Sequence, residues 1–244
     1  MRTIATLAFA TTIGLTLAGA AHAESRSFEL KDFDKIDIAT GIDAIVTIGD
    51  TFAVVADSNS PDALDNLRPT VSGGVLSAHF DQSFLDFIVS GGLVGMLLAN
   101  GNAISVNITL PAITGISASS GADVRAGNLS AENLEIEASS GSDIRLVSAT
   151  LGAVEVDASS GSSVDLSGTC NSIDAGASSG SSIDADGLVC ATATAQASSG
   201  ADIDVHATQS LKADASSGGN IEVRGNPAQT DIDSSSGGDV SLED

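Results

Sequence analysis

The sequence predicts an all-β fold, a single-stranded parallel β-helix with 18–20 residues in each coil. A Ser-Ser-Gly corner recurs at nearly constant spacing, and apolar and polar residues alternate on both sides of it. The array also lacks the three-to-four-residue apolar spacing of a helix. One repeat cannot bury its own apolar face, so the repeats must stack, each coil about 4.8 Å from the next.

The first element is a predicted signal peptide at residues 1–23. Arg2 precedes an apolar stretch and a small-residue A-x-A motif that ends at Ala23, which is typical of a cleavage site. No later stretch reaches the roughly 18 apolar residues that a membrane span needs. We therefore expect an exported protein, either periplasmic or secreted, that makes no contact with a membrane.

The composition excludes some partners of the mature chain. The formal net charge of −23 repels nucleic acid and anionic lipid headgroups and attracts cations. The chain has no Trp and no Tyr, yet 42% of its residues are hydrophobic. A core of Ala, Val, Ile and Leu must therefore replace the usual aromatic one.

Residues 24–110 are expected to form irregular coils that contain an apolar insertion at about 81–103. The stretch Ile36–Asp43 aligns with Ile136–Asp143 when one residue is dropped, so the repeat begins in this part. Within the insertion, residues 84–99 are nearly all apolar. They either plug the open end of the β-helix or bind a partner, of which a second copy of the chain is the favoured form. The candidate partner-binding residues are Phe84, Phe87, Leu93, Met96 and Leu97.

Residues 111–244 are predicted to form seven regular coils, each marked by the glycine of its corner. These glycines are Gly121, Gly141, Gly161, Gly180, Gly200, Gly218 and Gly237. Three residues after each stands a β-branched apolar residue: Val124, Ile144, Val164, Ile183, Ile203, Ile221 or Val240. A polar residue and then a further apolar residue follow, as in a strand with one buried face. We interpret the two Ser of each corner as bend-forming residues whose stacked hydroxyls bond from coil to coil.

The sequence resembles a known family in several segments together. FDKIDIATGIDAIVTIGD (33–50), VVADSN (54–59), VSGGVLSAHF (71–80) and ISVNITLPAITGISASSGADV (104–124) are similar to the putative auto-transporter adhesin head domain called GIN. The resemblance covers nearly the whole mature chain, so residues 24–244 are expected to be one domain. It implies a right-handed β-helix in an exported bacterial protein, and it brings no catalytic residues.

Cys170 and Cys190 lie in the same column of neighbouring coils, each ten residues before the Gly of its next corner. In-register neighbours have about the Cα separation that a disulfide accepts, and an exported protein can be oxidised. We therefore predict a disulfide between them. The alternative is a pair of stacked buried thiols.

An outward column of carboxylates is the candidate metal site: Asp165, Asp184, Asp204 and Glu222. A divalent cation such as Ca²⁺ would relieve their repulsion, but one column offers few ligands, so at most millimolar binding is expected. The alternative is a solvated acidic wall that keeps molecules from pairing edge to edge. Two coils earlier, Asp123, Arg125, Asp143 and Arg145 alternate in sign and are expected to pair locally.

The residues that could carry catalysis are sparse. His79 and His206 are the only His of the mature chain, and aromatic platforms for sugar stacking are absent. We predict no catalytic residues and no cofactor beyond weakly bound Ca²⁺. The predicted function is a non-enzymatic exported interaction module, related to adhesion or to the cell envelope. The alternative is a carbohydrate-active β-helix enzyme that uses paired carboxylates.

Overall fold

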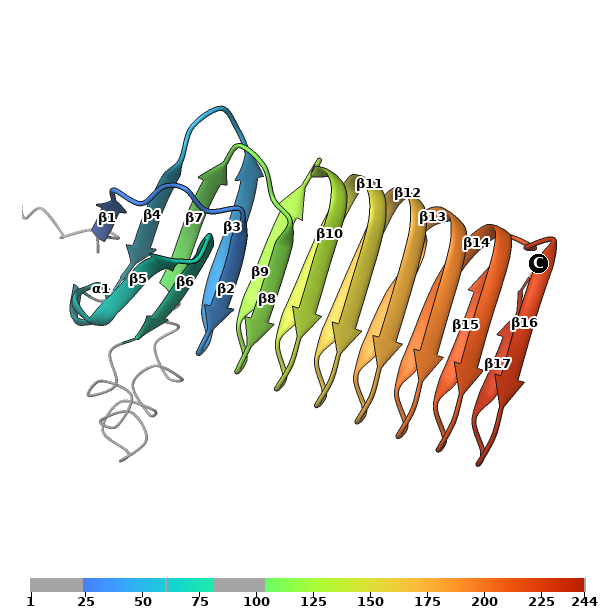
Figure 1. Cartoon of the computed structure of the whole chain (residues 1–244). Coiled ribbons are helices and arrows are strands. Elements are labelled where there is room, and N and C mark those ends of the chain that lie inside the picture. The colour runs from blue at the N-terminus through green and yellow to red at the C-terminus, as the bar shows by residue number, and fades with distance from the viewer. Residues whose placement is uncertain (1–23, 60, 81–103, 244) are drawn as a thin grey trace, which may run out of the picture.

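The computed structural model describes residues 24–59, 61–80 and 104–243, and it is a β-solenoid of about 6 turns with parallel stacked coils (Figure 1). The predicted signal peptide and the candidate partner-binding residues of the apolar insertion lie outside the described residues. One short helix, α1 (Pro61–Asn66), interrupts the strands of the N-terminal part. Among the described residues no helix has the length and apolar character needed to cross a bilayer.

The strands divide into an N-terminal group and a regular array. The N-terminal group comprises β1 (Glu24–Phe28), β2 (Lys35–Ala39), β3 (Ile42–Ile48), β4 (Ala53–Ser58), β5 (Leu67–Ser72), β6 (Val75–Phe80) and β7 (Ile104–Leu110). The array comprises β8 (Gly115–Ser119), β9 (Asp123–Gly127), β10 (Ser130–Ala138), β11 (Asp143–Ala158), β12 (Ser163–Ala177), β13 (Ser182–Ala197), β14 (Asp202–Ala215), β15 (Asn220–Arg224), β16 (Gln229–Ser234) and β17 (Asp239–Leu242).

Each regular coil has two longer sides that meet at the Ser-Ser-Gly corner. We call the side before the corner face A (β2, β8, β10, the second halves of β11–β14, and β16) and the side after it face B (β3, β9, the first halves of β11–β14, β15 and β17). A third, short side joins face B to the next face A, as at Thr150 and Leu151. The pairing between successive coils in the array is parallel throughout.

The predicted register is confirmed on face B. The β-branched residues that follow the corner glycines pair in one continuous line: Val124, Ile144, Val164, Ile183, Ile203, Ile221 and Val240. All but Val240 are buried. Because equivalent side chains stack along the axis, a narrow aliphatic core runs the length of the array. In part of the core small residues stack, as at Ala175 and Ala195.

The corner owes its shape to two consecutive left-handed residues. In the coil at residue 140 these are Ser140 at φ 55° and Gly141 at φ 71°, and the amide of Ser142 closes the turn on the carbonyl of Ser139 at 3.3 Å. The same pair of positive φ angles recurs at every corner, including Thr40 and Gly41 in the N-terminal part. The sequence alignment of the first irregular coil with the regular ones is therefore correct at its corner.

The hydroxyl that bonds from coil to coil belongs to a residue outside the Ser-Ser-Gly motif. In three coils the residue after the glycine is a buried serine, and its Oγ donates to a carbonyl oxygen of the preceding coil. The bonds are Ser142 to Ala118 at 2.9 Å, Ser162 to Ala138 at 2.9 Å and Ser181 to Ala158 at 2.8 Å. This corrects the expected ladder: the two motif serines bend the backbone, and the following serine makes the side-chain link.

In the N-terminal part the strands do not stack in sequence order. Strand β2 lies between β6 and β8, and β3 lies between β7 and β9, so the first coil is held between two later ones. Beyond them β5 pairs antiparallel with β6, β4 pairs antiparallel with β7, and β1 pairs antiparallel with β4 (Figure 1). Antiparallel strands therefore cover this end of the solenoid, where an open parallel edge would invite pairing with other chains.

The disulfide prediction is confirmed. Cys170 and Cys190 pair directly in the register of β12 and β13, with their Cα atoms 4.5 Å apart, and they are joined. Leu151 and Ala131 continue the same column toward the N-terminus, as the sequence spacing indicated. Both cysteines are buried, so the bond lies within the core wall, away from the surface.

Candidate interaction face

Face A carries an open groove that crosses several coils. Its largest hollow has a volume of about 570 Å³ and extends over β10–β13, and two neighbouring hollows measure about 290 Å³ and 420 Å³. The first two share Lys35 and Glu135, and the second and third share Ser117 and Glu137. The three hollows therefore form one surface, which we call the face A groove.

The outward residues of two columns make the walls and floor of this groove. One column reads Lys35, Gly115, Glu135, Glu155, Asp174, Thr194 and Lys212, and the other reads Asp37, Ser117, Glu137, Asp157, Gly176, Gln196 and Asp214. Small residues in the two columns leave room above the strands. At Gly176 the side chain of Asp157 uses this room, so an added Cβ would come within 2.8 Å of its carboxylate oxygen.

Lys35 crosses the groove near its N-terminal end. Its Nζ donates to Oε2 of Glu135 at 2.7 Å, and its aliphatic stem lies over Gly115, so that a Cβ there would meet Lys35 at 3.0 Å. The hydrogen bond to Glu135, together with that carboxylate's negative charge, raises the pKa of Lys35. The ion pair fixes the side chain at the boundary between two hollows.

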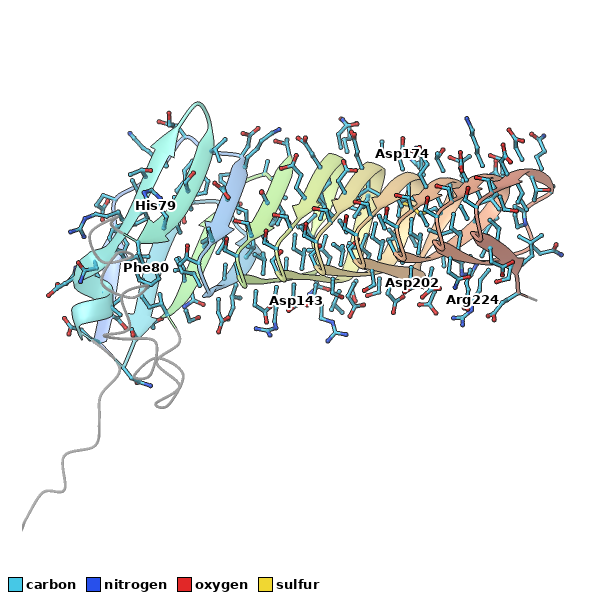
Figure 2. All side chains as sticks on the ribbon, turned by 90° about the horizontal axis from the view of Figure 1, so that it is seen from below. His79, Phe80, Asp143, Asp174, Asp202 and Arg224 are labelled. Atoms are coloured by element: carbon cyan, nitrogen blue, oxygen red, sulfur yellow. A yellow bond between two sulfur atoms is a disulfide. The ribbon has the colours of Figure 1, made fainter. Side chains whose placement is uncertain are left out.

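The groove is otherwise acidic and exposed. Glu137, Glu155, Asp157 and Asp174 all point to solvent, and none of them forms an ion pair within the described residues. Figure 2 shows Asp174 on one side of the solenoid and Asp143, Asp202 and Arg224 on the opposite side. The two faces can therefore meet different partners.

The predicted acidic column lies on face B, in register as expected. Asp165, Asp184, Asp204 and Glu222 are successive neighbours across β12–β15. Partial burial, and then the charges of Glu222 and Asp184, raise the pKa of Asp204 to about 6. Burial is also the main cause of the raised pKa of Asp184. Among the described residues no group of three or more carboxylates, histidines or cysteines is placed to hold a metal ion, so the calcium prediction has no preformed ligand set.

Three arginines form ion pairs with carboxylates of face B. Arg224 pairs with Asp186 and also, at 3.2 Å, with Glu243. Arg125 pairs with Asp123, as expected, but Arg145 reaches along the axis to Asp165 of the next coil. Of the four residues expected to pair locally, Arg145 therefore pairs outside the group. Its stacked neighbour, about 4.8 Å away, is closer than the residue two positions along the same strand, roughly 6.6 Å away.

Within the described residues, the two histidines lie apart. His79 lies on β6 near the N-terminal end (Figure 2), whereas His206 lies on β14 beside Arg224. The groove carboxylates Glu135, Glu155 and Asp174 are exposed. Asp204, whose pKa is raised, belongs to the other face.

Nothing in the sequence singled out the face A groove. Its residues were visible as polar positions of a strand, but which side of the coil is hollow depends on how three sides close around the core. The one hint of a hollow in the sequence was the small size of Gly176 and Ser117, which stand where other coils have Glu or Asp.

The comparisons with known proteins agree with this architecture. A family model described as putative auto-transporter adhesin, head GIN domain, matches residues 32–227. A putative adhesin from Bacteroides fragilis has a similar structure, with a TM-score of 0.77 and 21% identity, over 92% of this chain and 98% of its own. No curated protein matches the sequence.

Two further structures come from Parabacteroides. A putative lipid binding protein from Parabacteroides distasonis has a TM-score of 0.64 at 15% identity, and it covers 93% of this chain and 98% of its own. A putative adhesin from Parabacteroides merdae has a TM-score of 0.61 at 17% identity, with the same coverage of 93% and 98%. At such identities the similarity establishes the fold.

Proposed function

Because the chain belongs to the family of putative auto-transporter adhesin head GIN domains, we propose that it is an exported, non-enzymatic interaction module of the cell envelope with a role in adhesion. The face A groove carries this proposal, since it offers one continuous contact surface across several coils of a rigid solenoid. An extended ligand would touch many coils at once. Rigid, pre-formed surfaces of this kind lose little entropy on binding.

Export is supported by two observations. The disulfide between Cys170 and Cys190 is typical of proteins that fold in an oxidising compartment. The predicted signal peptide gives the route, with cleavage after Ala23. Mass spectrometry of the protein recovered from outside the cytoplasm should therefore find a mature chain that starts at Glu24.

The absence of enzymatic activity is supported by the exposure of the groove carboxylates and by the composition of the groove. The groove acids, such as Glu155 and Asp174, are open to solvent, whereas a catalytic pair of carboxyls usually includes one that is shielded from water. Thr192, Thr194 and Ser172 add hydroxyl groups that suit hydrogen bonding to a polar ligand. An acyl chain needs an apolar cavity that shields it from water. The open, polar groove does not provide one, so lipid binding is not proposed for it.

The test uses immobilised polymers of the bacterial envelope and cationic and anionic polypeptides as probes. The purified mature protein should be retained by at least one of them and should release no new reducing ends or peptide fragments from any. Release of reducing ends from a polysaccharide would replace the proposal with the hydrolase alternative. Failure to be retained by any probe would contradict the binding role.

A further inference from the structure

The charge of the face A groove indicates what kind of ligand it binds, which membership of the adhesin family alone does not. This inference rests on the proposed function, because it names the partner of the same surface. Along the first column, Glu135, Glu155 and Asp174 follow one another on successive coils. In the second column Glu137 and Asp157 stand beside the first two. The central part of the groove thus presents rows of carboxylates.

Fewer ion pairs form on face A than on face B. Among the described residues, Arg125, Arg145 and Arg224 pair with acids of face B, although Asp184, Asp204 and Glu222 of its acidic column are unpaired, whereas Lys35 with Glu135 is the one ion pair on face A. Carboxylates stacked about 4.8 Å apart repel one another even in water. A ligand that carries positive charge removes this repulsion, and a neutral or anionic one does not.

The spacing of the carboxylates within a strand matches an extended polypeptide. Glu135 and Glu137, like Glu155 and Asp157, are separated by one inward-facing residue. Side chains two apart on an extended chain point the same way and lie roughly 6.6 Å apart. A segment that lies over the groove parallel to the strands, with Lys or Arg at every second position, can therefore place its cations opposite both carboxylates of one strand at once.

Two lysines limit the acidic region along the axis. Lys35 stands two positions before Glu135 in the column, and Lys212 stands two positions after Asp174. Within the described residues, β11 carries an unpaired carboxylate in both columns, Glu155 and Asp157, and beyond Lys212 the strand β16 does so with Asp231 and Asp233. Because the hollow of about 570 Å³ lies over β11, a polybasic ligand is directed to that coil.

We propose that the face A groove binds an extended polybasic segment of a partner polypeptide, in which Lys or Arg alternates with small or polar residues. The segment runs parallel to the strands over β11, where its cations pair with Glu155 and Asp157 and reach the carboxylates of the neighbouring coils β10 and β12. Because the acids are exposed, each pair is weak and the affinity depends on several acting together. Binding should therefore fall steeply as salt is added.

The test measures the affinity of the mature protein for a short peptide in which Lys and Ser alternate. Two triple variants remove the same number of charges from exposed acids that form no ion pair with the part of the chain that the structure describes. Glu137→Gln/Glu155→Gln/Asp174→Asn changes the groove, and Asp143→Asn/Asp202→Asn/Asp239→Asn changes face B. The groove variant should bind about tenfold more weakly, which corresponds to the loss of three exposed charge pairs. The face B variant should stay within about twofold of the wild type, since its charges lie on the other side.

Several results would overturn the proposal. Equal weakening in both variants would mean that the peptide responds only to the net charge. No binding at all would exclude the polybasic ligand. Tighter binding of a peptide with the same composition, but with its lysines in one block, would exclude the matched spacing. Preferential binding of an amino-polysaccharide would assign the groove to a different class of ligand. Retention of the protein by envelope polymers is measured separately and does not depend on these results. Failure of this inference is therefore distinct from failure of the proposed function.

Discussion

At the scale of single residues, the corner illustrates what a sequence motif can and cannot convey. The glycine of each Ser-Ser-Gly was predictable as a corner because glycine adopts backbone angles closed to other residues. The left-handed geometry of the second serine was not, since a non-glycine residue rarely adopts it. Neither was the role of Ser142, because the same position holds Ala122 and Ala201 in other coils.

The left-handed glycine leads to a first prediction. At Gly161, with φ 72°, an added Cβ would meet nothing within 4 Å, so Gly161→Ala tests backbone strain alone. We expect a loss of about 1–2 kcal/mol in the free energy of unfolding, measured with urea. Gly127→Ala is the control, since it also has open space but no positive φ, and its stability should be unchanged or slightly raised. Equal effects at the two sites would contradict the account of the corner.

The raised pKa of Asp204 leads to a second prediction. Its pKa in the folded protein, about 6, lies above its ordinary value of 3.8, so the folded state holds the proton more tightly. This group therefore lowers stability as pH rises from about 4 to about 6, and the loss persists at higher pH. Asp204→Asn should raise the melting temperature at pH 8 and have little effect near pH 4. Asp214→Asn, which removes an exposed carboxylate of face A, is the matched control.

At the scale of elements, the regular strands were predictable because the information is local. A period of about twenty residues fixes which residues stack, so the partners of β11, β12 and β13 follow from the spacing alone. The N-terminal part was different. The placement of β2 between β6 and β8 depends on contacts distant in sequence, and alternation of apolar and polar residues does not distinguish a parallel partner from an antiparallel one.

The disulfide leads to a third prediction, at the level of the paired strands β12 and β13. The bond closes a loop with a sequence separation of 20. In the chain-entropy model its removal costs about 3 kcal/mol. The double variant Cys170→Ala/Cys190→Ala should therefore unfold at a lower urea concentration than the wild type. Reductant should lower the midpoint of the wild type and leave that of the variant unchanged; a wild-type midpoint unaffected by reductant would show that the bond contributes nothing.

At the scale of the whole molecule, charge and shape act together. The formal net charge of −23 is spread along a solenoid whose two longer faces both carry carboxylates. The sequence singled out the face B column from charge alone. The groove on face A needed the closed coil, because only the path of the backbone decides which side is hollow.

The net charge leads to a fourth prediction. Repulsion among the carboxylates lowers the stability of the compact state, and salt screens it over a Debye length of about 10 Å at 0.1 M. The melting temperature should therefore rise as sodium chloride increases from about 0.01 M to about 0.5 M. The groove variant Glu137→Gln/Glu155→Gln/Asp174→Asn should show a smaller rise, because fewer charges remain to be screened. A melting temperature that falls with salt would indicate that attractive pairs dominate.

The interleaved first coil makes the molecule mechanically asymmetric. Tension applied at the C-terminal side would detach β17, then β16, and then one turn after another. Each turn would lengthen the chain by about 65 Å. Unfolding from this side would stop at Cys190, which the disulfide links to Cys170. Tension applied at the N-terminal side would first detach β1 from β4 and would then meet β2 and β3, each of which pairs with a strand on both flanks. A tether anchored on that side should therefore resist with a single high rupture force, whereas the opposite side yields stepwise.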